Sequence, residues 1–273
     1  MITTIFHVAD IHIPNSNENR PYDEMLKGFI KTLAQRVKDC GQDNCRIVLA
    51  GDIFHNKVKI SNEAMAMFHT LLNYLNQIAK TYIIAGNHDM LENNQDKMDS
   101  LTPTFEIDEG YENIVYMDKV LGYKSGCILD DNIVFALYSM HDKFSVPNIQ
   151  DYAGDGRVVV GLYHGDMAGT VTDAGRMSDG GIDTDVFKPC DCVMAGHIHK
   201  FQTIKKNGVP VVYAGSLFQQ DMGENTSVHG FVEWDMETLE YQHVEVENNY
   251  RFFKLSVNSY DDIKDDVEEI INL

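Results

Sequence analysis

Short, mostly apolar runs along the chain predict a series of buried strands. The first three lie at residues 2–9, 46–50 and 82–85, and polar residues or glycine follow each of them. A run of this length, bounded in this way, is consistent with a strand buried in a sheet. Later runs predict further strands at residues 114–117, 127–130, 133–139, 157–163, 192–195 and 209–214, and a meander through 230–247.

Apolar residues at helical spacing predict two helices in the first third of the chain. Over residues 22–39 they recur every three or four positions, and Gly41 follows where a C-cap glycine belongs. A second helix is expected over residues 62–79, with Ser61 as its N-cap. Because helices alternate with strands early and strands dominate late, the pattern predicts a layered, mixed α/β fold.

Length and hydrophobicity narrow the class of protein. The chain has 273 residues, 44% of them hydrophobic, which supports a sizeable core in one large domain with a small appendage. We expect the main domain at residues 1–247 and the start of a second unit at 248–273. No apolar run approaches the roughly 18 residues of a membrane span, and the N-terminus lacks the features of a signal peptide. These features favour a cytoplasmic protein, or one in the host cytoplasm if the chain is viral.

The five cysteines are an odd number and form no paired zinc motif, which predicts reduced thiols in a cytosolic type of compartment. They are Cys40, Cys45, Cys127, Cys190 and Cys192.

The charge is strongly acidic, with a net value of −20 from 22 basic and 42 acidic residues. This argues against a passive electrostatic nucleic-acid-binding module, which is normally basic. It does not exclude an enzyme that acts on phosphodiesters, because bound divalent metals supply local positive charge.

Polar residues follow five of the predicted strands directly. The five endings read Asp10-Ile-His12, Gly51-Asp52, Gly86-Asn87-His88-Asp89, His164-Gly165 and Gly196-His197-Ile-His199. In open α/β sheets, ligands bind at the carboxyl ends of the strands. Each ending alone has an ordinary explanation, such as a turn or a pair of surface histidines. Five similar endings in one chain favour a shared site.

The side chains at these endings predict a metal centre. The candidate ligands are three carboxylates or amides and four imidazoles: Asp10, Asp52, Asn87, His12, His164, His197 and His199. Mixed oxygen and nitrogen ligands favour Mn²⁺, Fe²⁺ or Zn²⁺ over Ca²⁺ or Mg²⁺. Seven ligands are too many for one tetrahedral ion and fit two ions that share a carboxylate.

The five blocks, in order across residues 10–199, resemble those of the calcineurin-like metallophosphoesterases. Within that superfamily, three details are similar to the SbcD-type double-strand-break repair nucleases: "GDIFH" with His55, the final block "GHIHK", and the segment "VVYAGSLFQQDMGE" after it. The resemblance covers roughly residues 1–247. It implies an αββα sandwich of two mixed sheets flanked by helices, and a truncated or reduced capping domain that begins at residues 248–273.

The resemblance also implies a role for each site residue. Asp10, His12 and His199 would hold one ion, Asn87, His164 and His197 the other, and Asp52 would bridge the two. His88 would face the scissile phosphate and assist the leaving oxygen instead of binding metal, and His55 would orient the phosphate or the DNA strand. The implied reaction is in-line attack of activated water on a DNA phosphodiester, with Mn²⁺ as the expected metal.

The resemblance further implies partners: DNA, an SMC-like ATPase of the SbcC type, and a second copy of the chain. Met65 and Met67 on the helix over 62–79 are either core residues or part of such a dimer interface. Arg176 and Lys200, and less directly Lys205 and Lys206, are candidate phosphate contacts or ordinary surface residues. The glycine-rich loop over 165–185 is either a surface excursion or a lid beside the site.

Three functions remain open from the sequence. The leading hypothesis is a two-metal DNA nuclease, acting as an exonuclease on duplexes and an endonuclease on single strands, in DNA repair or recombination. The alternatives are a phosphoesterase that acts on phosphoproteins or cyclic nucleotides, and a non-catalytic scaffold for the ATPase.

Overall fold

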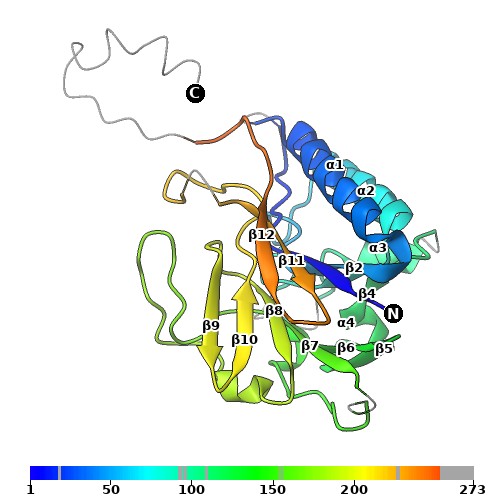
Figure 1. Cartoon of the computed structure of the whole chain (residues 1–273). Helices are drawn as coiled ribbons and strands as arrows, with labels where there is room; N and C mark the ends of the chain where they lie inside the picture. Colours follow the sequence, from blue (N-terminus) through cyan, green and yellow to red (C-terminus); the bar gives the residue numbers. More distant parts are fainter. Residues whose placement is uncertain are drawn as a thin grey trace.

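Two six-stranded sheets stack face to face, and two long helices cover the outer face of the first (Figure 1). This architecture comes from a computed structural model, which describes residues 1–17, 20–91, 94, 97–107, 110–152, 154, 156–225 and 228–252.

The first sheet has the strand order β12-β11-β1-β2-β3-β4. Strands β1 to β4 run parallel, and β11 pairs antiparallel with β1 and β12. The bounds of its strands are Thr4–Val8 (β1), Cys45–Ala50 (β2), Thr81–Ile84 (β3), Ile114–Tyr116 (β4), Gly230–Asp235 (β11) and Tyr241–Glu245 (β12).

The second sheet has the strand order β5-β6-β7-β8-β10-β9. Its four central strands run parallel, and the edge strands β5 and β9 are antiparallel to their neighbours. The bounds are Gly126–Asp130 (β5), Ile133–Tyr138 (β6), Val158–His164 (β7), Cys192–Gly196 (β8), Gln202–Lys206 (β9) and Val209–Tyr213 (β10).

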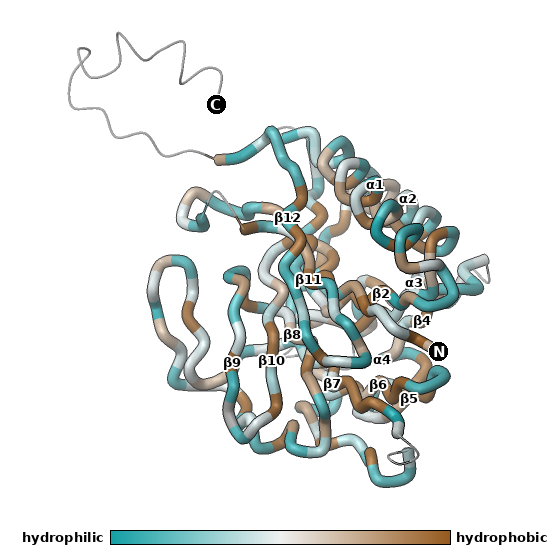
Figure 2. The backbone as a smooth tube through the Cα atoms, viewed as in Figure 1, coloured by the Kyte–Doolittle hydropathy of each residue, from teal (hydrophilic) through white to brown (hydrophobic). Residues whose placement is uncertain are grey.

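The long helices are α1 (Tyr22–Cys40) and α2 (Asn62–Ile78). The short helical segments are η1 (Gln42–Asn44), α3 (Thr102–Ile107), α4 (Met117–Val120), η2 (Met140–Asp142) and η3 (Thr184–Phe187). Figure 2 shows hydrophobic residues along the strands of both sheets, and a mixture of hydrophobic and hydrophilic positions on α1 and α2.

Both faces of the first sheet are buried, which explains its continuous apolar runs. In β2, Ile47 and Leu49 pack toward α1 and α2, whereas Val48 and Ala50 point toward the second sheet. This alternation follows from the two-residue period of a strand. The interlayer core continues into Phe135 and the other inward residues of the second sheet, whose outer face carries a third core covered by loops and η3. The predicted α/β sandwich is therefore confirmed.

The predicted elements agree with the structure to within two residues at each end, with three omissions besides the short segments η1, η2 and η3, which were not predicted either. Ser61 caps α2 by accepting a hydrogen bond from the Ala64 amide at 3.0 Å, and Gly41, with φ of 88°, ends α1. Met67 is buried and Met65, which is partly buried, packs against the same core; this favours the core alternative, and the dimer interface stays a prediction. The sequence analysis missed α3, α4 and β9.

The expectation of five reduced cysteines is wrong. Cys40 and Cys45 form a disulfide that links the end of α1 to the start of β2. The turn through Gly41 and η1 brings the two residues together, with Cα atoms 6.8 Å apart, and cysteine counting could not detect this local pairing. The other three cysteines are free and buried.

The segment after β12 packs against the main domain as far as residue 252. The Arg20 guanidinium lies 4.3 Å from the centre of the Phe252 ring, and the Tyr250 hydroxyl donates to Glu24 at 2.8 Å. The rest of the expected capping unit, residues 253–273, lies outside the described residues. Within the part of the chain that is described, no helix is long and apolar enough to cross a membrane.

Candidate metal centre

The carboxyl ends of five strands, three from one sheet and two from the other, meet at one edge of the sandwich. Asp10, Asp52 and Asn87 follow β1, β2 and β3 of the first sheet. His164 ends β7 and His197 follows β8 of the second sheet. The sequence predicted that the ligand residues meet at one edge of a sheet. In the structure, both sheets contribute to this edge.

The backbone bends sharply where the ligands leave their strands. Asp10, His12 and Asp52 have φ values of 51°, 53° and 52°, in the left-handed region that non-glycine residues rarely adopt. We call the segment that directly follows a strand its exit. Hydrogen bonds between the exits of β1 and β2 hold this conformation, from the Asp10 amide to the Gly51 carbonyl (3.1 Å) and from the His12 amide to the Asp52 carbonyl (2.9 Å). Strain of this kind is concentrated at functional sites.

Gly86 allows the exits of β2 and β3 to approach one another. A Cβ atom on Gly86 would lie 2.2 Å from both the amide nitrogen and Oδ1 of Asp52. The glycine before Asn87 is therefore required by close packing against the central carboxylate of the site.

Asp10, His12 and His199 form the first group of facing ligand atoms. Nε2 of His12 lies 3.0 Å from Nε2 of His199, and each of these nitrogens lies 3.9 Å from Oδ1 of Asp10. Their ligand atoms all lie within 4.8 Å of one another.

Asn87, His164 and His197 form a second group on the other side of Asp52. Oδ1 of Asn87 lies 3.2 Å from Nε2 of His164 and 2.7 Å from Nδ1 of His197. Asp52 reaches both groups, with Oδ1 3.3 Å from Nε2 of His164 and Oδ2 3.7 Å from Nε2 of His12. The structure therefore brings all seven predicted ligands together, with Asp52 between the two groups.

The charges of the site favour cations. Burial lowers the pKa of His164, but the Asp52 and Asp10 carboxylates together outweigh it and raise that pKa to about 9. Burial also disfavours charge on His199, whereas Glu224 and Asp10 raise its pKa to about 9. The Nε2 atoms of His12 and His199, which face one another across 3.0 Å, can share a proton or turn their lone pairs to a metal ion. The ligand atoms and the negative charge of the carboxylates thus fit two divalent ions.

His88 and His55 lie at the rim of the first group. The His88 amide donates to Oδ1 of Asp52 at 2.7 Å, and Nδ1 of His88 lies 2.6 Å from the His55 carbonyl. The His88 ring lies 4.7 Å from the His12 ring, and the His55 ring 5.6 Å from it, between centroids. By distance alone, His88 qualifies as a ligand together with His12 and Asp52.

Two further carboxylates of the site were not predicted. Asp89, fully buried, accepts hydrogen bonds from the backbone amides of Ile53, Phe54 and Gly86 at 2.9–3.2 Å and so ties the exits of β2 and β3 together. Glu224 contacts His199, with Oε1 2.5 Å from Nδ1. Asp89 lies inside one of the five blocks, which could have indicated it. Glu224 follows no strand ending, although it is the last residue of the quoted segment "VVYAGSLFQQDMGE".

The candidate phosphate contacts border the metal centre. Arg176 lines a cavity of about 240 Å³, and Lys200 lines another of about 370 Å³; both cavities include His197. The loop over 165–185 folds back on itself through bridges Met167–Ile182 and Val171–Met177. Gln202 of β9 fixes this loop, since its side chain both donates to and accepts from the Val171 backbone. The loop is therefore an ordered arm beside the site.

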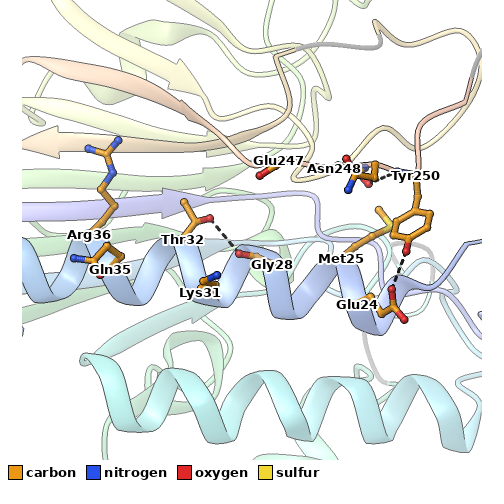
Figure 3. A pocket seen from close by; sticks show the side chains of 11 residues that line it. Glu24, Met25, Gly28, Lys31, Thr32, Gln35, Arg36, Glu247, Asn248 and Tyr250 are labelled. Atoms are coloured by element: carbon orange, nitrogen blue, oxygen red, sulfur yellow. Dashed lines mark hydrogen bonds between the residues drawn. The ribbon is translucent and has the colours of Figure 1, made fainter. Parts of the chain in front are cut away.

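A cavity of about 650 Å³ lies away from this edge, between α1 and the segment that follows β12 (Figure 3). Lys31 and Arg36 lie on the α1 side and Asn248 and Tyr250 on the other. It contains none of the predicted site residues, so its size alone does not mark the site.

Comparison with known proteins identifies the family. Residues 3–201 match the family model described as calcineurin-like phosphoesterase. The uncharacterized protein R555 of Acanthamoeba polyphaga mimivirus is 30% identical over 264 residues, which is 94% of this chain but 19% of R555. The putative phosphoesterase 244L of Invertebrate iridescent virus 6 is 26% identical over 231 residues, covering 81% of this chain and 72% of its own length.

Two more distant matches agree with this result. The DNA double-strand break repair protein Mre11 of Archaeoglobus fulgidus is 27% identical over 85 residues, which are 30% of this chain and 18% of that protein. One solved structure superposes on 90% of this chain and on 100% of its own chain, with a TM-score of 0.57 at 10% identity, which supports the fold alone. Since the matched family model spans most of the chain and contains every predicted ligand, the protein belongs to the calcineurin-like phosphoesterase family.

Proposed function

We propose that the protein is a two-metal phosphodiesterase that cleaves DNA. The observation that carries the proposal is the convergence of seven ligands from two sheets, with Asp52 between two groups and His88 at the rim. Two divalent ions, when bound, would polarise the phosphoryl oxygens and activate the attacking water. We propose Mn²⁺ as the metal.

The chain's own residues would position the substrate and move the proton. His88 is held by its amide on Asp52 and by Nδ1 at the His55 carbonyl, so its Nε2 is available to the leaving oxygen. His55, beside the His88 ring, would orient the phosphate. Arg176 and Lys200, which line the neighbouring cavities, would contact the phosphates on either side.

DNA is the substrate that the motifs and relatives favour. The segments "GDIFH" and "VVYAGSLFQQDMGE" are similar to those of SbcD-type nucleases. A partial match to a double-strand break repair protein supports the same class. The role would be processing of DNA ends in repair or recombination, in the cytoplasm of a cell or, as the viral relatives suggest, of an infected host.

The acidic composition suggests that other chains hold the DNA. With a net charge of −20, the chain offers few cations to the sugar–phosphate backbone. We propose that an SMC-like ATPase and a second copy of the chain supply this surface. The chain spans about a fifth of the length of the mimivirus relative. The assembly with an ATPase and a second copy is therefore a proposal about the whole protein.

A Mn²⁺-dependent assay on linear duplex DNA tests the function, with and without a candidate ATPase. Mononucleotide or short oligonucleotide products are expected, and the His88→Asn variant serves as the inactive control. Hydrolysis of cyclic nucleotides or phosphoproteins but not of DNA would favour the other phosphoesterase hypothesis. Absence of any Mn²⁺-dependent phosphodiester hydrolysis would favour the scaffold.

A further inference from the structure

Glu224, outside the predicted ligand set, lies directly behind one of the imidazoles. Its Oε1 is 2.5 Å from Nδ1 of His199, and its side chain is only 7% exposed. When Nδ1–H donates to Glu224, the lone pair of His199 is on Nε2, the atom that faces His12 and Asp10. The carboxylate thus fixes both the tautomer and the direction of this ligand.

The surrounding segment holds Glu224 in turn. Its Oε2 accepts hydrogen bonds from the backbone N–H of Gln220 at 2.8 Å and from the Ser216 hydroxyl at 3.3 Å. The same segment donates backbone hydrogen bonds to two ligand residues, from Ser216 to the His199 carbonyl and from Leu217 to the Asp10 carbonyl. Glu224 is therefore built into the wall of the first group and is not a mobile surface side chain.

His164 and His12 lack such support. Nδ1 of His164 lies 2.7 Å from the carbonyl oxygen of Ala50, a neutral acceptor. Nδ1 of His12 is buried and has no hydrogen-bond partner among the described residues. Within this part of the chain, Glu224 is the carboxylate that orients an imidazole of the first group from outside the ligand set.

We propose that Glu224 is a positioning residue for the ion held by Asp10, His12 and His199, so that its loss affects the two metal positions unequally. An anionic acceptor behind an imidazole makes the ring a stronger ligand and fixes its geometry. Loss of Glu224 therefore weakens the first position and leaves the ion at Asn87, His164 and His197 in place. The inference rests on the proposed two-metal site.

The test is the Mn²⁺ content and affinity of metal-free protein reloaded with Mn²⁺, measured by calorimetry and elemental analysis. Wild type is expected to bind two ions. Glu224→Ala should bind one ion normally and the other roughly 10- to 100-fold more weakly. With two equivalents, at a protein concentration below the weaker dissociation constant, the electron paramagnetic resonance spectrum of Glu224→Ala should show an isolated Mn²⁺ where wild type shows a coupled pair. Glu224→Gln keeps an acceptor for Nδ1–H and should recover part of the affinity.

Asp173→Asn is the matched control, because Asp173 lines the same cavity and its interactions among the described residues, with the Asn225 backbone, Glu224, His229 and Lys200, do not include His199. It should bind both ions like wild type, and the thermal stability of the metal-free variants should show that each is folded. Two normal ions in Glu224→Ala, loss of both together, or an equal loss in Asp173→Asn would overturn the inference. A wild type that binds only one ion would overturn the two-metal site itself.

Discussion

Individual residues of the centre depart from ordinary backbone preferences in a consistent way. Asp10, His12 and Asp52 all have positive φ, and each follows an apolar strand that prefers the extended conformation. Left-handed non-glycine residues cost on the order of 1–3 kcal/mol each, so the fold must compensate for them. Interlocked hydrogen bonds between the β1 and β2 exits do so. The strain is therefore a consequence of aiming polar side chains at one point.

The role of His88 can be separated from that of the ligands by substitution. His88→Asn should leave both metals bound and lower kcat by roughly 100-fold or more, because the imidazole assists proton transfer and is not needed for assembly. Metal content and turnover are measured on the same preparation. If metal content falls as far as turnover, His88 is a ligand, as its distance to His12 and Asp52 would allow.

The sequence predicted the ligands but not the residues that orient them. Asp52 and His164 were visible because each directly ends an apolar run. Glu224 lies 25 residues after His199, at the end of the segment "VVYAGSLFQQDMGE", but nothing in that segment shows which imidazole the carboxylate would contact. Contacts that depend on how a long loop folds back are set by tertiary packing, which a single sequence does not show.

At the level of elements, strands buried on both faces were the easiest to predict. β2 and β3 are continuous apolar runs between the helices and the second sheet. β9 was missed because this edge strand, Gln202–Lys206, carries polar and basic residues, as edge strands often do. The six-residue helix α3 was missed because it is too short for a periodic pattern and contains Pro103.

The junction of the β2 and β3 exits should tolerate no side chain at position 86. Gly86→Ala places a Cβ 2.2 Å from Asp52 atoms, so we expect about 1–3 kcal/mol lower stability and weaker metal binding. Denaturant unfolding and metal titration measure the two effects. Gly180→Ala is the control, because a Cβ there meets no atom within 4 Å and should change neither quantity. Wild-type behaviour of Gly86→Ala would show that the exits do not need this close approach.

On the scale of the whole molecule, the centre exists only while the two sheets remain stacked. The first sheet supplies Asp10, Asp52 and Asn87, and the second supplies His164 and His197. Packing between the sheets is therefore a condition for metal binding. A change that separates the layers should remove metal binding and catalysis together.

His7 makes this packing sensitive to acid. It is fully buried on β1, where neither ring nitrogen has a hydrogen-bond partner among the described residues, and burial lowers its pKa to about 3. The His7 side chain therefore stays neutral in the folded protein, whereas in the unfolded chain it takes up a proton near pH 6.5. The contribution of His7 to stability is complete above that pH and falls by about 1 kcal/mol per pH unit between 6.5 and about 3.

Denaturant unfolding as a function of pH checks this expectation. His7→Leu removes the titration, so its stability relative to wild type should rise steadily as the pH is lowered below 6.5. A difference between the two proteins that stays constant with pH would mean that His7 is not held neutral between the sheets.

The count of bound metal ions in wild type and in Asp52→Ala tests the central claim most directly. Asp52 lies between the two ligand groups, within 3.3 Å of His164 and 3.7 Å of His12. We expect two Mn²⁺ ions per wild-type chain and the loss of both in the Asp52→Ala variant. A tightly bound ion retained by Asp52→Ala would contradict the shared carboxylate, and a wild type without metal would contradict the centre itself.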